Sequence, residues 1–258
     1  MPQFTFRAKR FAAQWLSTTF QVCRPRVLLG HRIVTFHAID TLVDGDVNGI
    51  YNMAQKTFVR HIHAIKQIGE QQQSFDTVAF GSTLTDSVSI TFDDGYLSTL
   101  KFAAPLLTRY SLPFHVFVTP SLVQSNDRRY LSIPQLRELS EIPQVTIGAH
   151  GYRHIPISQI SESDRLNELS AARTWLEDVL QKQIQTMSYP FGSTPANIHH
   201  VVSQAGYSTA ASSLWGINNS STNRLMLKRI DLWEGDSNRT LISKLLGYWN
   251  WIGRRSSA

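Results

Sequence analysis

Strand-like and helix-like segments alternate along most of this chain. The expected strands are short apolar runs at 32–39, 87–93, 114–120, 144–150, 186–190, 208–212 and 225–232. Segments with helical spacing of apolar residues separate them, including 52–68 and a stretch expected to break at Pro105. This alternation favours a mostly parallel sheet with helices outside, in which functional residues gather at the carboxyl ends of the strands. Because the composition is unbroken from 30 to 245, we expect one α/β barrel.

Basic residues are concentrated at the N-terminus. The formal net charge is +6, and residues 1–39 contain basic side chains but no acid. We therefore divide the chain into a basic, aromatic arm, 1–31, and a barrel with its C-terminal helix, 32–258. The aromatic and basic residues at both ends suit packing on the barrel, which we favour, or peripheral contact with an anionic membrane. We expect no nucleic-acid partner, since no dense basic patch exists beyond the arm.

Cysteine content and hydropathy bear on where the protein works. The single Cys23 excludes an intramolecular disulfide. No run approaches the roughly 18 apolar residues of a membrane span, and the N-terminus lacks the apolar core of a secretory signal. We therefore expect a cytoplasmic protein, or one at the inner face of the membrane.

An acidic pair ends one of the expected strands. In the sequence SVSITFDDG, Asp93 and Asp94 directly precede Gly95. Successive residues of a strand point to opposite faces, so both carboxylates can serve one site only if the backbone turns there. Gly95 permits such a turn. Alone, this pair is more typical of a solvated turn or a helix cap, and a functional site needs further residues.

Two histidines follow the expected strand 144–150. His150 and His154 are four residues apart, and in a single helical turn this spacing places both imidazoles on one face. Pro156 limits any helix here to about one turn. Two histidines and one carboxylate would hold a divalent metal and leave a position open for water and substrate. The second carboxylate of the acidic pair is then free to act as a general base.

Two other strand ends carry candidate residues. The turn SYPFG, 188–192, offers backbone N–H groups to the same centre, or is an ordinary strand-to-helix turn. His37 ends the expected strand 32–39, where a lone histidine is usually structural. No G-x-S-x-G elbow, phosphate-binding glycine loop or Cys/His cluster is present, which disfavours a serine hydrolase, a nucleotide enzyme or a structural zinc module.

The motifs TFDDG, HGYRH and YPFG, in this order, resemble those of the NodB-homology polysaccharide deacetylases, carbohydrate esterase family 4. The similarity covers about 32–235 and implies a distorted (β/α) barrel, usually of seven strands. It also implies hydrolysis of acetyl groups on sugars with a divalent metal, commonly zinc. The resemblance makes Asp93 the base, Asp94, His150 and His154 the metal ligands, and the N–H of Phe191 an oxyanion donor.

Two features depart from the family pattern. The arginine that many members carry early in the third motif is replaced within MSY, and Arg229 in LKRIDLW is our candidate for an equivalent charge. Most members also have a histidine near the C-terminus, and here none follows His200. In the poly-N-acetylglucosamine deacetylases of the family this histidine ends an N-terminal strand. The run VTFHAI is similar, which makes His37 the candidate general acid.

The expected substrate is an N-acetylated polysaccharide or a lipid-linked saccharide, from which acetate is released. The main alternative is a non-catalytic carbohydrate-binding or glycan-assembly protein on the same barrel. Missing metal ligands would favour that alternative, and the sequence lacks none. A metal-dependent phosphodiesterase is a second alternative, but it would be expected to bring ligands for a second metal.

Overall fold

The structure is a computed structural model that describes residues 12, 30–46, 48–71, 76–77, 80 and 87–250. Most of the arm 1–31 and the basic pair Arg254 and Arg255 lie outside these residues. The favoured packing of both ends on the barrel and the alternative, peripheral contact with a membrane, therefore both stay predictions. Among the described helices, none combines the length and the apolar character that crossing a membrane requires.

Within the described residues, seven parallel strands close into a barrel. These strands are β1 (His31–Phe36), β5 (Ser87–Phe92), β6 (Phe114–Val118), β7 (Val145–Ala149), β8 (Thr186–Ser188), β9 (Thr209–Trp215) and β10 (Leu227–Asp231). They pair in chain order, and β1 pairs with both β5 and β10, which completes the ring. The short β4 (Asp76–Thr77) adds to the start of β5, while β2 (Ala38–Ile39) pairs with β3 (Asn52–Met53). The expected α/β barrel is confirmed.

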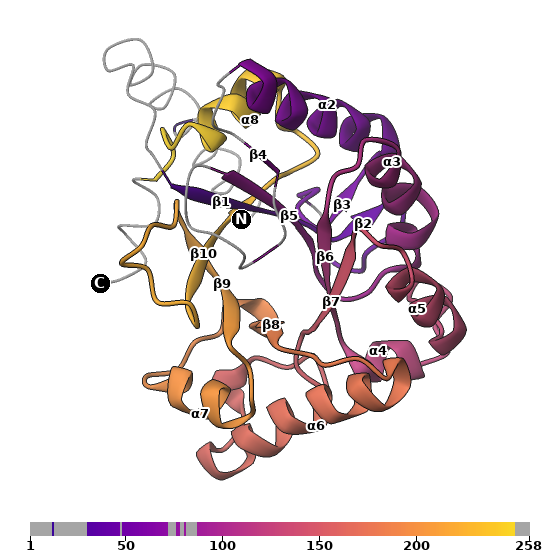
Figure 1. Cartoon of the computed structure of the whole chain (residues 1–258), viewed down its shortest axis with the longest axis vertical. Coiled ribbons are helices and arrows are strands. Elements are labelled where there is room, and N and C mark those ends of the chain that lie inside the picture. The colour runs from indigo at the N-terminus through magenta and orange to yellow at the C-terminus, as the bar shows by residue number, and fades with distance from the viewer. Residues whose placement is uncertain are drawn as a thin grey trace.

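Helices surround the strands, as Figure 1 shows. They are α2 (Gln55–Gln71), α3 (Ala104–Arg109), α4 (Pro120–Gln124), α5 (Ile133–Ser140), α6 (Glu162–Leu180), α7 (Ile198–Gln204) and α8 (Asn238–Leu245). The predicted break at Pro105 is wrong, because a π-helix at Thr99–Ala103 runs directly into α3. Pro105 lies in the first turn of α3, directly after the π-helix, and the helix continues through it.

The two faces of the barrel strands differ in character. In β5, Val88, Ile90 and Phe92 belong to the main apolar core, and the ring of Phe92 lies 5.9 Å from that of Phe58 on α2. The alternate residues of β5 are serine and threonine, and Thr91 donates a hydrogen bond to the Val34 carbonyl at 2.9 Å. Because side chains alternate along a strand, the apolar set faces the helices and the polar set faces the interior.

One expected strand is interrupted at a candidate site residue. The run 32–39 was expected to be continuous, but β1 ends at Phe36 and β2 begins at Ala38. The reason is that β2 leaves the barrel to pair with β3, with Ala38 opposite Asn52. His37 therefore lies in a bend at the carboxyl end of β1 rather than inside a strand.

Candidate metal centre

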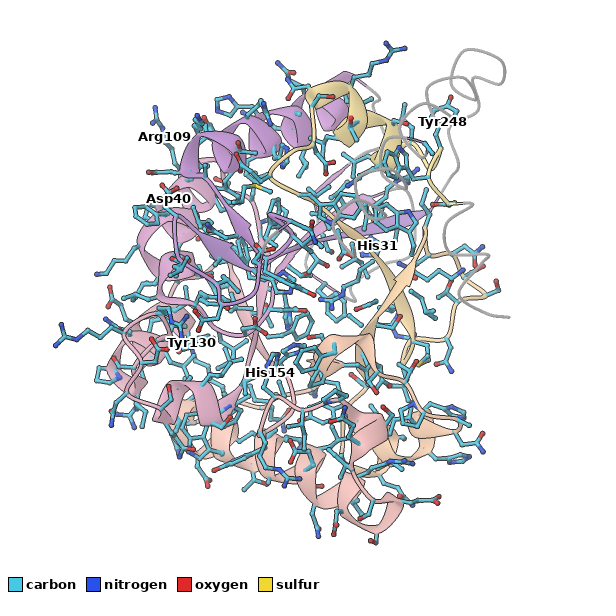
Figure 2. All side chains as sticks on the ribbon, turned by 180° about the vertical axis from the view of Figure 1, so that it is seen from behind. His31, Asp40, Arg109, Tyr130, His154 and Tyr248 are labelled. Carbon is cyan, nitrogen blue, oxygen red and sulfur yellow. The ribbon has the colours of Figure 1, made fainter. Side chains whose placement is uncertain are left out.

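A pocket of about 430 Å³ opens at the carboxyl ends of the barrel strands. Its lining includes every residue that the sequence suggested for the site, namely His37, Asp93, Asp94, His150, His154, Phe191 and Arg229. His154 lies near the middle of the molecule in Figure 2, whereas Arg109 lies at its edge. The barrel thus brings residues that lie in or directly after five of its strands, β1, β5, β7, β8 and β10, into one hollow.

The acidic pair enters this pocket through a sharp turn of the backbone. The amide of Asp93 continues the ladder by donating to the Phe36 carbonyl at 3.0 Å. Asp94 and Gly95 then adopt φ values of 73° and 86°, and the Gly95 N–H donates back to the Asp93 carbonyl at 3.0 Å. Aspartate tolerates this left-handed region better than most residues. The turn lets two consecutive carboxylates point into the same pocket.

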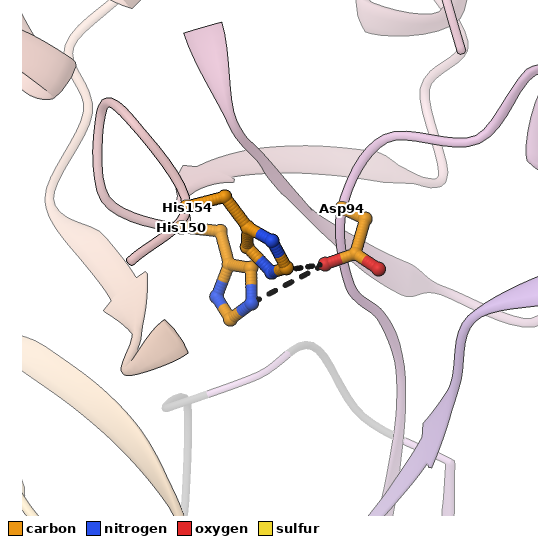
Figure 3. Close-up of side chains that lie close together, drawn as sticks. All are labelled: Asp94, His150 and His154. Carbon is orange, nitrogen blue, oxygen red and sulfur yellow. Dashed lines mark ion pairs between the residues drawn. The ribbon is translucent and has the colours of Figure 1, made fainter. Parts of the chain in front are cut away.

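Asp94, His150 and His154 converge, as Figure 3 shows. Asp94 Oδ1 lies 3.0 Å from His154 Nε2 and 3.4 Å from His150 Nε2, and one donor atom from each residue lies within 4.8 Å of the others. Asp94 Oδ1 is buried and lies within ion-pair distance of both imidazoles. One carboxylate and two imidazoles suit a divalent ion such as zinc with an open position.

The two histidines do not share a helical turn, so that prediction is wrong. Residues 150–154 form an irregular loop in which Gly151 and His154 have φ values of 64° and 55°. The buried Glu168 of α6 shapes this loop, because Glu168 Oε1 accepts the backbone N–H groups of Tyr152 and Arg153 at 2.9 and 2.8 Å. The ring centroids of the two histidines are 5.1 Å apart.

Ser188 orients the buried His150. Its hydroxyl lies 2.6 Å from His150 Nδ1, and its backbone carbonyl lies 3.0 Å from the same nitrogen. Because a carbonyl only accepts, Nδ1 carries the proton and Nε2 presents a lone pair to Asp94 and His154. Burial lowers the pKa of His150 to about 4, which keeps the ring neutral. A neutral imidazole with a fixed outer hydrogen bond is the form that ligates metals.

Arg229 holds Asp93 apart from the ligand set. Arg229 Nη1 donates to Asp93 Oδ1 at 2.8 Å, and Ser188 Oγ lies 3.3 Å from the same oxygen. The other oxygen, Asp93 Oδ2, lies 3.9 Å from His150 Nε2. Burial raises the pKa of Asp93, but the Arg229 guanidinium, together with the nearby His150 and His37, more than offsets this and holds the pKa below its usual range. Asp93 is therefore an ionised carboxylate with one oxygen facing the histidines.

Aromatic rings flank the remaining candidates. His37 is half-buried, and its ring lies 4.9 Å from that of Tyr51 at an interplanar angle of 76°. Phe191 has a φ of 56°, the residue is 63% exposed, and its ring lies 4.7 Å from that of His154. His37 and His154 thus each pack against one aromatic ring at the pocket.

Three residues of the site were not identified from the sequence. Ser188 stands in the recognised SYPFG turn, but nothing in the sequence showed that its hydroxyl reaches two other motifs. Glu168 interrupts the buried face of α6 beside Leu169, and a buried acid on an apolar helix face was its available signal. Tyr51 lies in an irregular segment and offered no signal.

Comparisons with known proteins agree with this geometry. The sequence matches the family described as Polysaccharide deacetylase over residues 80–210. A curated relative, the Putative polysaccharide deacetylase YxkH of Bacillus subtilis, is 22% identical over 120 residues. That match covers 46% of this chain and only 42% of the length of the relative.

Several solved structures share the fold. The Streptococcus pyogenes deacetylase PplD is 18% identical, with 84% of this chain and 98% of that chain covered and a TM-score of 0.73. IcaB from Ammonifex degensii is 18% identical, with coverages of 85% and 97% and a TM-score of 0.71. A de-N-acetylase from Aggregatibacter actinomycetemcomitans is 15% identical, with coverages of 84% and 100% and a TM-score of 0.69. With a family match over half of its length, this chain belongs to the polysaccharide deacetylase family.

Proposed function

We propose that this protein is a metal-dependent hydrolase that removes acetyl groups from N-acetylated sugars of a polysaccharide or glycan precursor. One observation carries the proposal. Asp94, His150 and His154 converge on one point, while Arg229 holds the adjacent Asp93 outside this set in ionised form. A ligand set with a neighbouring unligated carboxylate is what metal-assisted hydrolysis requires.

The donor set fits a divalent metal, and we propose zinc. Asp94, His150 and His154 would hold the ion, and its chemistry when bound is to polarise a carbonyl and to make water more acidic. Ser188 supports this use because it fixes the tautomer of His150. Glu168 supports it because it fixes the loop that carries both histidines.

Asp93 acts as the general base in this proposal. Its Oδ2 accepts a proton from the water that attacks the acetyl carbonyl carbon, while Oδ1 stays bonded to Arg229. Arg229 also donates from Nε to the Ser212 carbonyl at 2.8 Å, so the guanidinium has two fixed anchors. Arg229 thereby orients the base and supplies the charge that other family members take from the third motif.

His37 acts as the general acid. As an imidazolium it donates a proton to the amide nitrogen while the carbon–nitrogen bond breaks, and the products are acetate and a free amino sugar. The backbone N–H of Phe191 stabilises the oxyanion formed in between. His37 and Phe191 line the same pocket as the ligand set, which supports both assignments. The sequence VTFHAI, which resembles the N-terminal motif of the permuted members of the family, also supports the assignment of His37.

The site supports neither of the two alternatives, a non-catalytic carbohydrate-binding or glycan-assembly protein and a metal-dependent phosphodiesterase. A non-catalytic binding protein would be favoured by an incomplete ligand set, and all three ligands are present here. A second metal for phosphodiester hydrolysis would need another cluster, and the described residues contain no other group of three or more candidate ligands.

Mass spectrometry of oligomers of N-acetylglucosamine tests the proposed function. Incubation with zinc-loaded protein should remove about 42 Da per acetyl group, the mass difference that the hydrolysis chemistry fixes. A chelator and the Asp93→Asn variant should each prevent this loss. Oligomers of unchanged mass, across several linkages and at high protein concentration, would contradict the proposal.

A further inference from the structure

Two exposed aromatic rings stand at the pocket. The exposed large hydrophobic side chains of the described residues are those of Leu42, Tyr51, Leu166 and Phe191. Both aromatic members of this set line the pocket. Pyranose sugars carry patches of C–H groups that pack on aromatic rings, so exposed rings beside a sugar-processing site point to sugar contact. The substrate class in this inference comes from the proposed function.

Tyr51 is held rigidly at this position. The carboxylate of Asp46 accepts the backbone N–H groups of Ile50, Tyr51 and Asn52 at 2.8, 2.9 and 2.7 Å. The Tyr51 carbonyl accepts from the Ala38 N–H at 2.8 Å, which ties it to the segment after β1. Because the backbone of this loop is already fixed, binding does not have to order it, which lowers the entropy cost of a contact with the Tyr51 side chain.

The Tyr51 ring lies on the side of the pocket that contains the proposed acid. It packs against His37 at a centroid distance of 4.9 Å, whereas Phe191 packs against His154. Tyr51 nevertheless remains 43% exposed, so much of its surface is free for a ligand. A sugar packed on Tyr51 would have its acetylated nitrogen near His37.

The hydroxyl of Tyr51 is available as a donor. No hydrogen bond joins it to any other residue in the part of the chain that the structure describes. Burial, followed by the nearby charge of Asp231, raises the pKa of Tyr51, so the phenol keeps its proton at neutral pH. It can therefore donate to a hydroxyl or carbonyl oxygen of a sugar.

We propose that Tyr51 is a sugar-binding residue that sets specificity at this site. Its ring packs on the C–H face of the N-acetylated sugar, and its hydroxyl donates to an oxygen of the same sugar. Both contacts need a pyranose ring, so Tyr51 favours acetylated sugars over small acetamides that lack one.

Equilibrium binding tests the assignment without depending on turnover. The probe is the β-1,4-linked pentamer of N-acetylglucosamine, titrated calorimetrically into the zinc-loaded Asp93→Asn variant. Adding Tyr51→Leu should raise Kd about tenfold, the equivalent of one aromatic contact. Adding Tyr51→Phe should raise Kd about threefold, because it keeps the ring and loses one hydrogen bond. Leu42→Ala, at an exposed residue of the same loop that does not line the pocket, should leave Kd unchanged.

Kinetics distinguish sugar binding by Tyr51 from a purely structural role. If Tyr51 binds the sugar, Tyr51→Leu in a chain that keeps Asp93 should raise KM more than it lowers kcat, with zinc content and melting temperature unchanged. A Kd within twofold of that of Asp93→Asn alone, a pentamer that fails to bind, or a fall in kcat alone would overturn the assignment.

The failure of this inference is distinguishable from that of the proposed function. Acetate release by the natural protein with an unchanged Kd in Tyr51→Leu keeps the hydrolase and removes Tyr51 from sugar binding. No acetate release with a tenfold rise in Kd removes the hydrolase and keeps Tyr51 as a sugar-binding residue.

Discussion

Arg229 donates to Asp93 at 2.8 Å across the pocket floor, and neither side chain is more than 3% exposed. The two residues belong to β10 and to the end of β5, far apart in the sequence. The pair fixes the charge state of the proposed base and also closes a buried part of the barrel. The contribution of the pair to the free energy of unfolding and the role of Asp93 in turnover can be measured separately.

Replacing Arg229 with methionine should destabilise the protein by about 3–5 kcal/mol, because the Asp93 charge then stays buried without its cation. Urea unfolding of the purified variant measures this change. Lys182→Met is the control, since Lys182 is partly exposed and contacts the exposed Glu141 and the Ser140 carbonyl, and its urea midpoint should move much less. Equal midpoints for Arg229→Met and the control would contradict the structural part of the account.

Asp93→Asn should retain zinc but lose turnover by a factor of about 10² to 10⁴, because an amide cannot accept the proton of the attacking water. Kinetics and elemental analysis of the same sample measure the two properties. The assignment of the base is wrong if this variant deacetylates at the natural rate.

Ser188→Ala should weaken zinc binding about 10- to 100-fold, because His150 loses the hydroxyl that contacts its Nδ1. Competition with a chromogenic chelator gives the affinity. Ser208→Ala removes an exposed serine hydroxyl outside the pocket and should leave it unchanged. Equal affinities for the two variants would show that the Ser188 hydroxyl does not orient the ligand and that the Ser188 carbonyl suffices.

His37→Ala should lower kcat by a factor of about 10² to 10⁴ with zinc retained, because the departing nitrogen loses its proton donor. The exposed His63 provides the control, since it contacts Tyr110 outside the pocket. If His37→Ala and His63→Ala have the same kcat, another group must protonate the leaving nitrogen.

Two buried histidines should make the fold sensitive to acid. Burial lowers the pKa of His115 to about 3 and that of His31 to about 4. Both values lie below the ordinary pKa of an unfolded histidine, so below about pH 6.5 protons bind preferentially to the unfolded chain. Stability should fall by about 1.4 kcal/mol per pH unit per histidine as the pH drops from about 6.5 toward 4.

Urea unfolding at about pH 7 and about pH 5 measures this loss. His115→Gln should reduce the difference between the two pH values, and the exposed His63→Gln should not change it. An unchanged difference in His115→Gln would mean that His115 takes up protons equally in both states.

The barrel could be predicted because short stretches of sequence already indicate its strands and helices. Alternating apolar and polar residues in 87–93 and helical spacing in 52–68 indicated a strand and a helix, and both are present as β5 and α2. Parallel strands then bring their carboxyl ends together, so the acidic pair and the histidine pair were expected in one site. They meet there.

The errors came from turns and from contacts between distant segments. The spacing of His150 and His154 suggested a helical turn, but Glu168 binds the loop backbone instead. The sequence spacing of two residues does not reveal a hydrogen-bond partner that lies on another helix or strand. For the same reason the hydroxyl of Ser188 and the position of Tyr51 beside His37 could not be predicted.

Titration of chelator-treated protein with zinc tests the central claim most directly. Acetate release from an N-acetylglucosamine oligomer should be absent at first, rise with added zinc, and reach a plateau at one equivalent. His154→Ala should shift the rise to a much higher zinc concentration. Acetate release that is independent of zinc, or absent at every zinc concentration, would contradict a metal centre built from Asp94, His150 and His154.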